Sequence, residues 1–309
     1  FQTAPGQFAT FFTDISDRKF VEETLSFLAQ QTPSLSGKSF FDNLALFLAT
    51  HLKMTFVCID RLEGDGLNAT TVSVWHNGIF EDNVTYALKD TPCGQVVGKQ
   101  VCCYPASVTR LFPNDLVLQD LKAESYVGVT LWGQEGQPIG LIAVVGQAPL
   151  IHRERIENTL QLVAVRAAAE LERLDWETAL HRSQTILART EQIAHVGGWE
   201  WDVANDRTTW SDELFHLFKL NTAGVAPSFA DQAHYYDPDD MQRLKEAVEA
   251  AVTCGTPYEM ELCAIRSDGV RRTCLARGYA EVGSENKVTR LFGSLQDITE
   301  QNLVEEQHL

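Results

Sequence analysis

Long apolar runs are missing from this sequence. A membrane-spanning helix needs about 20 apolar residues, whereas the longest candidates here, such as 139–145, have the length of a strand. The first residues also lack the basic start and apolar stretch of a signal peptide. We therefore expect no membrane span in this chain and a cytoplasmic location.

Cysteines at metal-binding spacing are also missing. The seven cysteines include no Cys-x-x-Cys pair, so the sequence predicts neither a structural zinc site nor any other metal ligand. Their odd number and irregular spacing are typical of a reducing compartment, where thiols stay free.

Positive charge is scarce. The chain has 25 Lys and Arg against 42 Asp and Glu, a net charge of −17, which disfavours nucleic acids and anionic membranes as partners. Hydrophobic residues make up 44% of the 309 residues, which excludes a disordered chain, and the length predicts two domains. Because the sequence starts without Met and reads as mid-domain, we expect a piece of a longer protein.

The first half of the sequence predicts helices followed by antiparallel strands. A strand is expected to end near residue 13, and Asp14-Ile15-Ser16-Asp17 then opens a helix that Pro33 ends. A second helix is expected from the capping-box residue Ser39. Strands are expected at 55–62, 69–76, 126–132 and 138–146, with an irregular segment at 77–125.

A long helix is predicted from about Arg153 to Ala194, where no Gly or Pro occurs. Its length would be roughly 60 Å. The spacing of its apolar stripe contains a stutter, which unwinds a left-handed supercoil. We expect a linker helix that packs against a second copy as a coiled coil, although its first half also fits a helix lying on its own sheet. The stripe consists of Ile156, Leu160, Val163, Ala167, Leu171 and Leu174.

The second half predicts another antiparallel sheet. Strands are expected at 199–203, 208–210, 258–266, 270–282 and 287–295, with helices at 212–219 and 241–254. Asp268-Gly269 indicates a two-residue hairpin turn, which would place Cys263 opposite Cys274 with both thiols on one side of the sheet. Asp297-Ile298-Thr299-Glu300 repeats the pattern at residues 14–17, so a similar domain is expected upstream of residue 14.

Residues 195–301 resemble a PAS domain. The similarity lies in Gly198-Trp199-Glu200-Trp201-Asp202, Trp210-Ser211, Asp237-Pro238-Asp239-Asp240, Arg266-Ser267-Asp268-Gly269 and the stretch 293–299. Tyr236 stands where that family usually has His. Residues 39–150 resemble a GAF domain of bacterial sensors. That similarity lies in Thr91-Pro92-Cys93-Gly94, Tyr104-Pro105, Leu111-Phe112-Pro113, the stretch 123–129, and Gly136 with Pro138-Ile139-Gly140.

Together these patterns predict an α+β protein of two domains, each with a central antiparallel sheet flanked by helices, joined by a long helix. The expected segments are the tail of an upstream PAS-like domain with a connecting helix (1–32), a GAF-like domain (33–152), a linker helix (153–195), a PAS-like domain (196–299) and the start of a helix to an output domain (300–309). The resemblance implies the regulatory region of a histidine kinase or a diguanylate cyclase.

No catalytic centre is expected within this chain. Gly94–Lys99 has the wrong spacing for a phosphate-binding loop, and no Gly-Gly-Asp-Glu-Phe run or phosphoacceptor His is present. Haem ligation through His216 or His234 is weakly indicated, and no cofactor is identifiable. Candidate pocket residues, taken from the aromatic and cysteine pattern, are Trp75, Tyr86, Cys93, Cys103, Tyr104, Trp201, Trp210 and Phe215.

Three functions stay open at this point. The first is a sensory module that detects a small ligand or redox state and relays it through the linker helices of a homodimer. The second is a spacer and dimerisation module without a ligand. The third is an activity like that of free methionine sulfoxide reductases, which are GAF proteins, with Cys93 and Cys103 as the reacting thiols, although the third cysteine of that family is absent near 126–128.

Overall fold

The computed structural model describes the backbone of residues 2–4, 7–8, 16–30, 37–64, 66–283 and 287–307. The chain divides into two compact units, unit 1 at Phe1–Thr178 and unit 2 at Ala179–Leu309. The expected strand end at 9–13, Asp14 and the helix end at Pro33 lie outside the described residues. The expected α+β class is confirmed, whereas the finer domain boundaries stay predictions.

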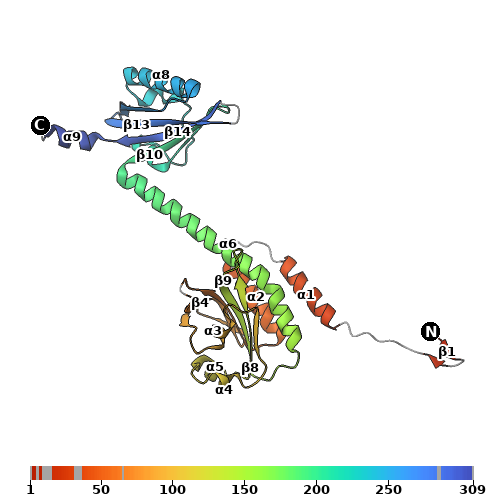
Figure 1. Ribbon diagram of the computed structural model, residues 1–309. Helices are drawn as coiled ribbons and strands as arrows, with labels where there is room; N and C mark the ends of the chain where they lie inside the picture. The colour runs from red at the N-terminus through yellow and green to blue at the C-terminus, as the bar shows by residue number, and fades with distance from the viewer. Residues whose placement is uncertain are drawn as a thin grey trace. The chain divides into compact units, whose positions relative to one another are not determined.

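Unit 1 is built on a seven-stranded antiparallel sheet with the order β5-β4-β3-β9-β8-β7, in which β6 also pairs with β4 (Figure 1). Its strands are β3 (Phe56–Leu62), β4 (Asn68–His76), β5 (Ile79–Glu81), β6 (Thr85–Ala87), β7 (Val101–Tyr104), β8 (Ser125–Trp132) and β9 (Pro138–Gly146). A separate antiparallel pair is formed by β1 (Gln2–Ala4) and β2 (Gln7–Phe8). The central strands are buried on both faces, which is why β8 and β9 read as continuous apolar runs.

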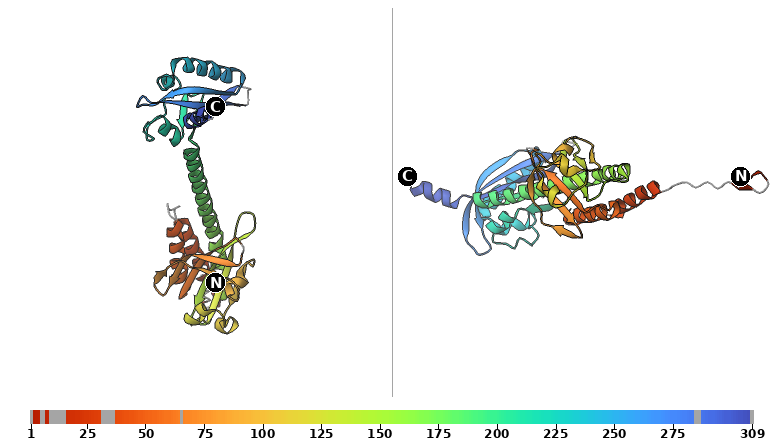
Figure 2. Two further views of the ribbon diagram at one scale, coloured as in Figure 1. Left: turned by 90° about the vertical axis from the view of Figure 1, so that its left-hand side faces the viewer. Right: turned by 90° about the horizontal axis from the view of Figure 1, so that it is seen from below.

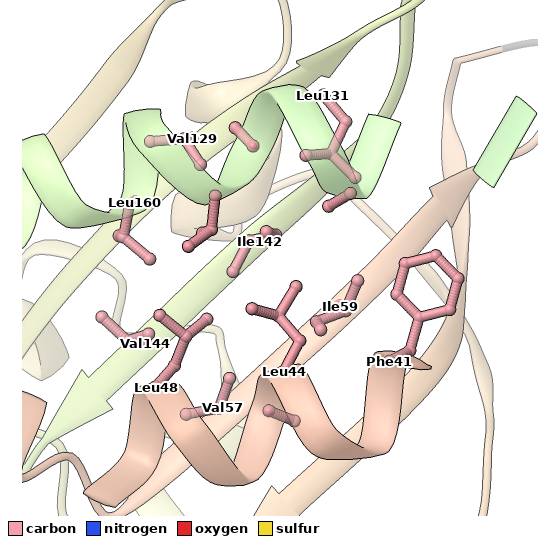
Figure 3. Packing of buried hydrophobic residues seen from close by; sticks show 14 of the residues in the cluster. Phe41, Leu44, Leu48, Val57, Ile59, Val129, Leu131, Ile142, Val144 and Leu160 are labelled. Atoms are coloured by element: carbon pink, nitrogen blue, oxygen red, sulfur yellow. The ribbon is translucent and has the colours of Figure 1, made fainter. Parts of the chain in front are cut away.

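Two helices cover one face of this sheet. They are α2 (Gly37–Leu52) and the first half of α6 (Arg153–Ala194). Figure 3 shows side chains of both helices, such as Leu48 and Leu160, directed at Ile142 and Val144 of β9. A further helix, α1 (Ser16–Gln30), packs on α2, where the rings of Phe27 and Phe47 stack 4.1 Å apart. The helix α2 begins two residues before the expected cap at Ser39.

The helix α6 has the expected length, but the residues expected to form its coiled-coil stripe have a different role. Leu160, Val163, Ala167 and Leu171 are fully buried against the sheet of unit 1, and Leu174 packs on the same cluster. Their assignment as dimer contacts is therefore wrong. This half of the helix instead lies on its own sheet, which is the alternative that the sequence left open. Its apolar stripe is broader than the narrow seam of a coiled coil. Among the described helices none is long and apolar enough to cross a membrane.

The opposite face of the sheet is covered by short helices and strands that the periodicity of the sequence did not predict. Within the segment 77–125, which was expected to be irregular, lie β5 to β7 and three helices. These helices are α3 (Pro92–Val96), α4 (Val108–Leu111) and α5 (Leu116–Asp120). They enclose a second core with Tyr126 and Leu141 of the sheet. Helices of four or five residues are too short to show a 3.6-residue period.

Unit 2 has a five-stranded antiparallel sheet with the order β11-β10-β14-β13-β12. Figure 2 gives two further views of this sheet, whose last strands are blue. Its strands are β10 (Val196–Asp202), β11 (Arg207–Trp210), β12 (Tyr258–Ile265), β13 (Arg271–Val282) and β14 (Val288–Asp297). Its helices are the second half of α6, α7 (Asp212–Leu217), a 3-10 turn (Asp231–Tyr235), α8 (Pro238–Cys254) and α9 (Thr299–Gln307). One face of the sheet packs on α7, the 3-10 turn and α8 around an apolar core.

Two facing glycines shape the middle of this sheet. Gly278 of β13 pairs with Gly293 of β14. A Cβ atom on Gly278 would lie 2.3 Å from the ring of Tyr258, and one on Gly293 would lie 2.7 Å from the ring of Trp199. The two rings, which stack 6.5 Å apart, therefore occupy the space that side chains would fill.

The β12–β13 hairpin differs from its prediction by one residue. Cys263 pairs with Thr273, and Cys274 pairs with Leu262, because Arg266–Val270 forms a loop of odd length instead of a two-residue turn. A shift of one residue turns a side chain to the other face. The two thiols therefore lie on opposite faces, with Cys274 buried in the core, and the expected placement on one face is wrong.

We predict that Leu171→Ala lowers the free energy of unfolding by about 2–5 kcal/mol, because it leaves a cavity in a packed core. The matched control is Ile186→Ala on the same helix, where the side chain is 55% exposed and the change should stay within about 0.5 kcal/mol. Urea unfolding of the full chain, followed by circular dichroism, measures both. An unchanged stability in Leu171→Ala, together with a loss of dimer mass, would restore the coiled-coil assignment.

Candidate functional site

A group of buried polar side chains lies in unit 1 between the sheet and α3. Cys58 and Asp60 are two residues apart on β3, so both point to the α3 face. Cys93 of α3 meets them there. One ligand atom from each of the three side chains lies within 4.8 Å of the others, and all three residues are buried.

Two tyrosine hydroxyls complete this cluster, which we call the thiol–carboxylate cluster (Cys58, Asp60, Tyr86, Cys93, Tyr126). Tyr86 donates a hydrogen bond to Asp60 Oδ2 at 2.9 Å. Tyr126 donates to the Sγ atom of Cys93 at 3.2 Å. Each phenol therefore holds one of the acidic groups in place.

Local sequence explains how Cys93 reaches the cluster. Thr91 caps α3 by accepting a hydrogen bond from the backbone N–H of Gly94 at 3.1 Å, and Pro92 suits the first helical position. A Cβ atom on Gly94 would lie 2.2 Å from the carbonyl oxygen of Leu88. Only glycine allows the backbone to approach this closely, and the approach fixes Cys93 above β3.

Burial and the neighbouring acidic groups shift the pKa values of the cluster. Burial raises the pKa of Asp60 to about 6, although Tyr86 and Cys58 both favour the charged form. Contact with Cys93, followed by burial, raises the pKa of the Cys58 thiol well above its usual value. Burial and the nearby Cys93 likewise raise the pKa of Tyr126. Arg61, the next residue on β3, lies on the other face and pairs with Asp175 at 2.7 Å.

The sequence found only part of this cluster. Tyr86 and Cys93 are in it, and Tyr104 packs beside it, with its ring 6.1 Å from that of Tyr126. Trp75 does not belong to it, because it packs on the α2 face. Cys58, Asp60 and Tyr126 were missed; an acidic residue within the apolar run of β3 was the available signal.

The pairing of Cys93 with Cys103 for reductase chemistry is wrong. Cys93 lies in the core on the α3 side of the sheet, whereas Cys103 packs against the core on the α2 and α6 side. Neighbouring residues of β7 point to opposite faces, so Cys102 and Cys103 are separated in the same way. Burial also raises the pKa of Cys103 to about 11, which opposes a thiolate nucleophile.

Unit 2 contains an aromatic cavity of about 40 Å³. Trp201 and Trp210 line it, as the sequence predicted, together with Trp199, Tyr236 and Tyr258. Phe215 does not line it, but packs against Trp210 with ring centroids 5.5 Å apart. Such a volume suits one or a few water molecules, since ligand pockets usually have several hundred Å³.

Few polar groups face this cavity. Gln232 donates to the carbonyl of Pro227 at 3.3 Å, and Thr208 Oγ1 is buried without a hydrogen-bond partner among the described residues. Burial raises the pKa of Tyr236 and of Tyr258, so both hydroxyls stay neutral. The cavity is therefore neutral and mostly apolar.

The two histidines considered for haem lie away from this cavity. His216 is exposed on α7 with Nδ1 3.6 Å from Glu213 Oε2, and His234 belongs to the 3-10 turn. Neither lines the cavity.

The helix α6 ends, and α9 begins, at the same place on the sheet of unit 2. His195, which ends α6 with a positive φ of 51°, accepts a hydrogen bond from the N–H of Asp297 at 3.0 Å. Asp297 Oδ1 accepts hydrogen bonds from the N–H of Thr299 at 2.9 Å and from its hydroxyl at 2.6 Å. The N–H of Thr273 on β13 donates to the Thr299 hydroxyl at 2.9 Å. We call these four residues the helix junction.

We predict that Asp60→Asn stabilises the protein above about pH 6, because ionising this carboxyl costs more in the folded than in the unfolded chain. With a pKa of about 6 against the model-peptide value of 3.8, the cost appears as pH rises through this window and reaches about 3 kcal/mol. The gain in unfolding free energy should grow from about pH 4 to pH 7. Urea unfolding in EDTA buffer measures it, and a pH-independent difference contradicts the assignment.

Comparison with known proteins gives structural matches but no sequence match. No family model matches the sequence, and no curated protein does so. A sensory box histidine kinase/response regulator from Burkholderia thailandensis is 21% identical, with 39% of this chain and 90% of that chain covered and a TM-score of 0.33. The N-terminal domain of a diguanylate cyclase with PAS/PAC sensor from Marinobacter aquaeolei is 17% identical over 35% and 98%, with a TM-score of 0.32.

The GAF domain of an Acinetobacter phosphoenolpyruvate-protein phosphotransferase is 13% identical, with 54% of this chain and 99% of that chain covered and a TM-score of 0.44. By name, these three structures are a sensory box protein, a PAS/PAC sensor domain and a GAF domain, each under 25% identical to this chain.

Proposed function

We propose that this chain is a sensory and relay module of a signal-transduction protein. The observation that carries the proposal is the helix junction, where α6 ends and α9 begins. Asp297, the last residue of β14, is hydrogen-bonded both to His195 at the end of α6 and to Thr299 at the start of α9, and Thr299 is also bonded to Thr273 of β13. A small shift of these strands therefore acts on both helices at once.

The aromatic cavity is the proposed origin of such a shift. It is lined by Ala276, Leu291 and Leu295 of β13 and β14, the same two strands that lead to the helix junction. Relay requires that the cavity has two packing states and that a ligand favours one of them. Its volume limits the ligand to a small, neutral molecule unless side chains move.

Substitution of Ala276 by Val tests the relay, because its added methyl groups fill the cavity as a small ligand would. We expect slower amide hydrogen exchange at the start of α9, by about threefold or more, and no such change when Asp297→Ala is added to cut the contact with Thr299. The control is Val282→Ile, at an exposed position of the same strand. Unchanged amide hydrogen exchange at residues 297–301 in Ala276→Val would contradict the proposed relay.

A spacer without a ligand is the second candidate, and the small cavity volume favours it. Native mass spectrometry and a thermal-shift panel of small neutral compounds separate the two functions. A co-purified mass or a stabilised melt supports the sensor. Neither result, together with unaltered exchange in Ala276→Val, supports the spacer.

We further propose a homodimer through the exposed side of α6. Trp176, Leu180 and Leu187 are exposed, and their spacing of four and seven residues places them on one stripe of the helix. A second copy of the helix presents the same stripe, so a two-fold contact is self-complementary.

Trp176→Glu with Leu180→Glu should halve the mass measured by light scattering across a dilution series. A matched control is Leu111→Glu on α4, which is also exposed. A parent protein that is monomeric at every concentration rules the dimer out.

The parent protein in this proposal is a histidine kinase or a diguanylate cyclase, to whose output domain α9 leads. This assignment is supported by the resemblance of the sequence to the sensory regions of such proteins. We place the module in the cytoplasm, in keeping with its seven free cysteines.

A further inference from the structure

The thiol–carboxylate cluster combines three metal-ligating side chains in one buried place. Cys58 is 6% exposed, Asp60 is fully buried and Cys93 is 8% exposed. Their ligand atoms lie within 4.8 Å of one another. The relay proposed for unit 2 uses none of them.

The buried carboxyl group of Asp60 is compensated only in part. Asp60 Oδ2 accepts one hydrogen bond from Tyr86, but Oδ1 is buried without a hydrogen bond among the described residues. Cys58 and Cys93, whose sulfur atoms lie within 4.8 Å of this carboxyl group, are acids themselves and bring no positive charge. A buried carboxylate is retained when it is paired with a cation or coordinates a metal.

The geometry suits a small tetrahedral ion. With zinc–sulfur distances of about 2.3 Å, two thiolates on one tetrahedral ion lie roughly 3.8 Å apart. Small side-chain rotations would reduce the observed separations between the ligand atoms, which are up to 4.8 Å, to this value. One strand supplies Cys58 and Asp60 and α3 supplies Cys93, so the ligands stand on two elements packed against each other.

The two phenols act as an outer shell. Tyr126 donates to the sulfur of Cys93, and Tyr86 donates to the oxygen of Asp60. Metal ligands in proteins are commonly oriented by such second hydrogen bonds, which also reduce the negative charge that the ligands bring together. Two phenol donors, one on each kind of ligand, are otherwise unexplained in a core that is apolar around them.

We propose that Cys58, Asp60 and Cys93 bind a thiophilic divalent metal ion, with Zn²⁺ as the ordinary occupant. Two thiolates exclude Ca²⁺ and Mg²⁺, which take oxygen ligands. Three protein ligands leave the fourth position to water or a small ligand. The proposal goes beyond the sensory function and stands without it, since the metal binds in unit 1 whether or not unit 2 relays a signal.

Cobalt reports on the site directly, because Co²⁺ bound by thiolates absorbs through charge transfer in the near ultraviolet. The full chain is stripped with a chelator, kept reduced with a phosphine and titrated with Co²⁺. We expect one Co²⁺ per chain, with the visible bands of a tetrahedral ion, and displacement by one equivalent of Zn²⁺. Absence of thiolate charge-transfer absorption in the folded protein overturns the proposal.

Variants assign the ligands. The double variant Cys58→Ser with Cys93→Ser should abolish the charge-transfer band, and each single variant should reduce it by half or more. Cys103→Ser should keep it, because Cys103 lies on the other face of the same sheet. Tyr126→Phe should weaken Co²⁺ binding about 10–100-fold, as loss of an outer-shell partner does. A band of undiminished intensity in the double variant places the metal elsewhere and overturns the site.

A folding defect would not hide the result, because one ligand can be removed without destabilising the chain. Asp60→Asn keeps the size of the side chain and an oxygen that can accept the hydrogen bond from Tyr86, so the metal-free variant is expected to fold, yet to bind Co²⁺ at least tenfold more weakly. Zn²⁺ should raise the melting temperature of the parent protein and of Cys103→Ser equally, and that of Asp60→Asn by clearly less. Equal stabilisation of the parent protein and Asp60→Asn by Zn²⁺ contradicts the assignment of the carboxylate.

Discussion

The strict alternation of side chains along β3 is the constraint on which unit 1 depends. Val57 and Ile59 pack against α2, while Cys58 and Asp60 face α3. Both faces are covered, so neither set can reach water. Polar groups on a strand that is buried on two sides must find their partners within the protein, and two phenols and a second thiol lie beside Cys58 and Asp60.

The same alternation separates groups that look adjacent in the sequence. Cys102 and Cys103 lie side by side on β7 but belong to different cores. Cys263 and Cys274 would share a face if the turn between them had two residues. The longer loop Arg266–Val270 shifts the pairing by one residue, so the two thiols lie on opposite faces of the sheet. In both cases spacing along the chain was a poor guide, because one residue decides the face.

Sequence patterns predicted the larger elements well. The strand at Pro138–Gly146 has its expected bounds, and the long helix at Arg153–Ala194 is present in full. The partner of that helix could not be predicted, since a stripe such as Leu160 and Leu171 serves a sheet and a coiled coil equally. The thiol–carboxylate cluster could be predicted only in part, for another reason. Asp60 and Cys93 are distant in the sequence, and α3, the short helix that carries Cys93, has no periodic signal.

The facing glycines Gly278 and Gly293 have a consequence for the aromatic cavity of unit 2. The rings of Tyr258 and Trp199 lie where side chains on these glycines would be, so the position of the cavity wall is set by residues that do not touch the cavity. Related proteins that keep the same lining residues but differ at these two positions would have cavities of a different size. The range of ligand sizes that such a fold can accept thus depends on two backbone positions outside the cavity lining.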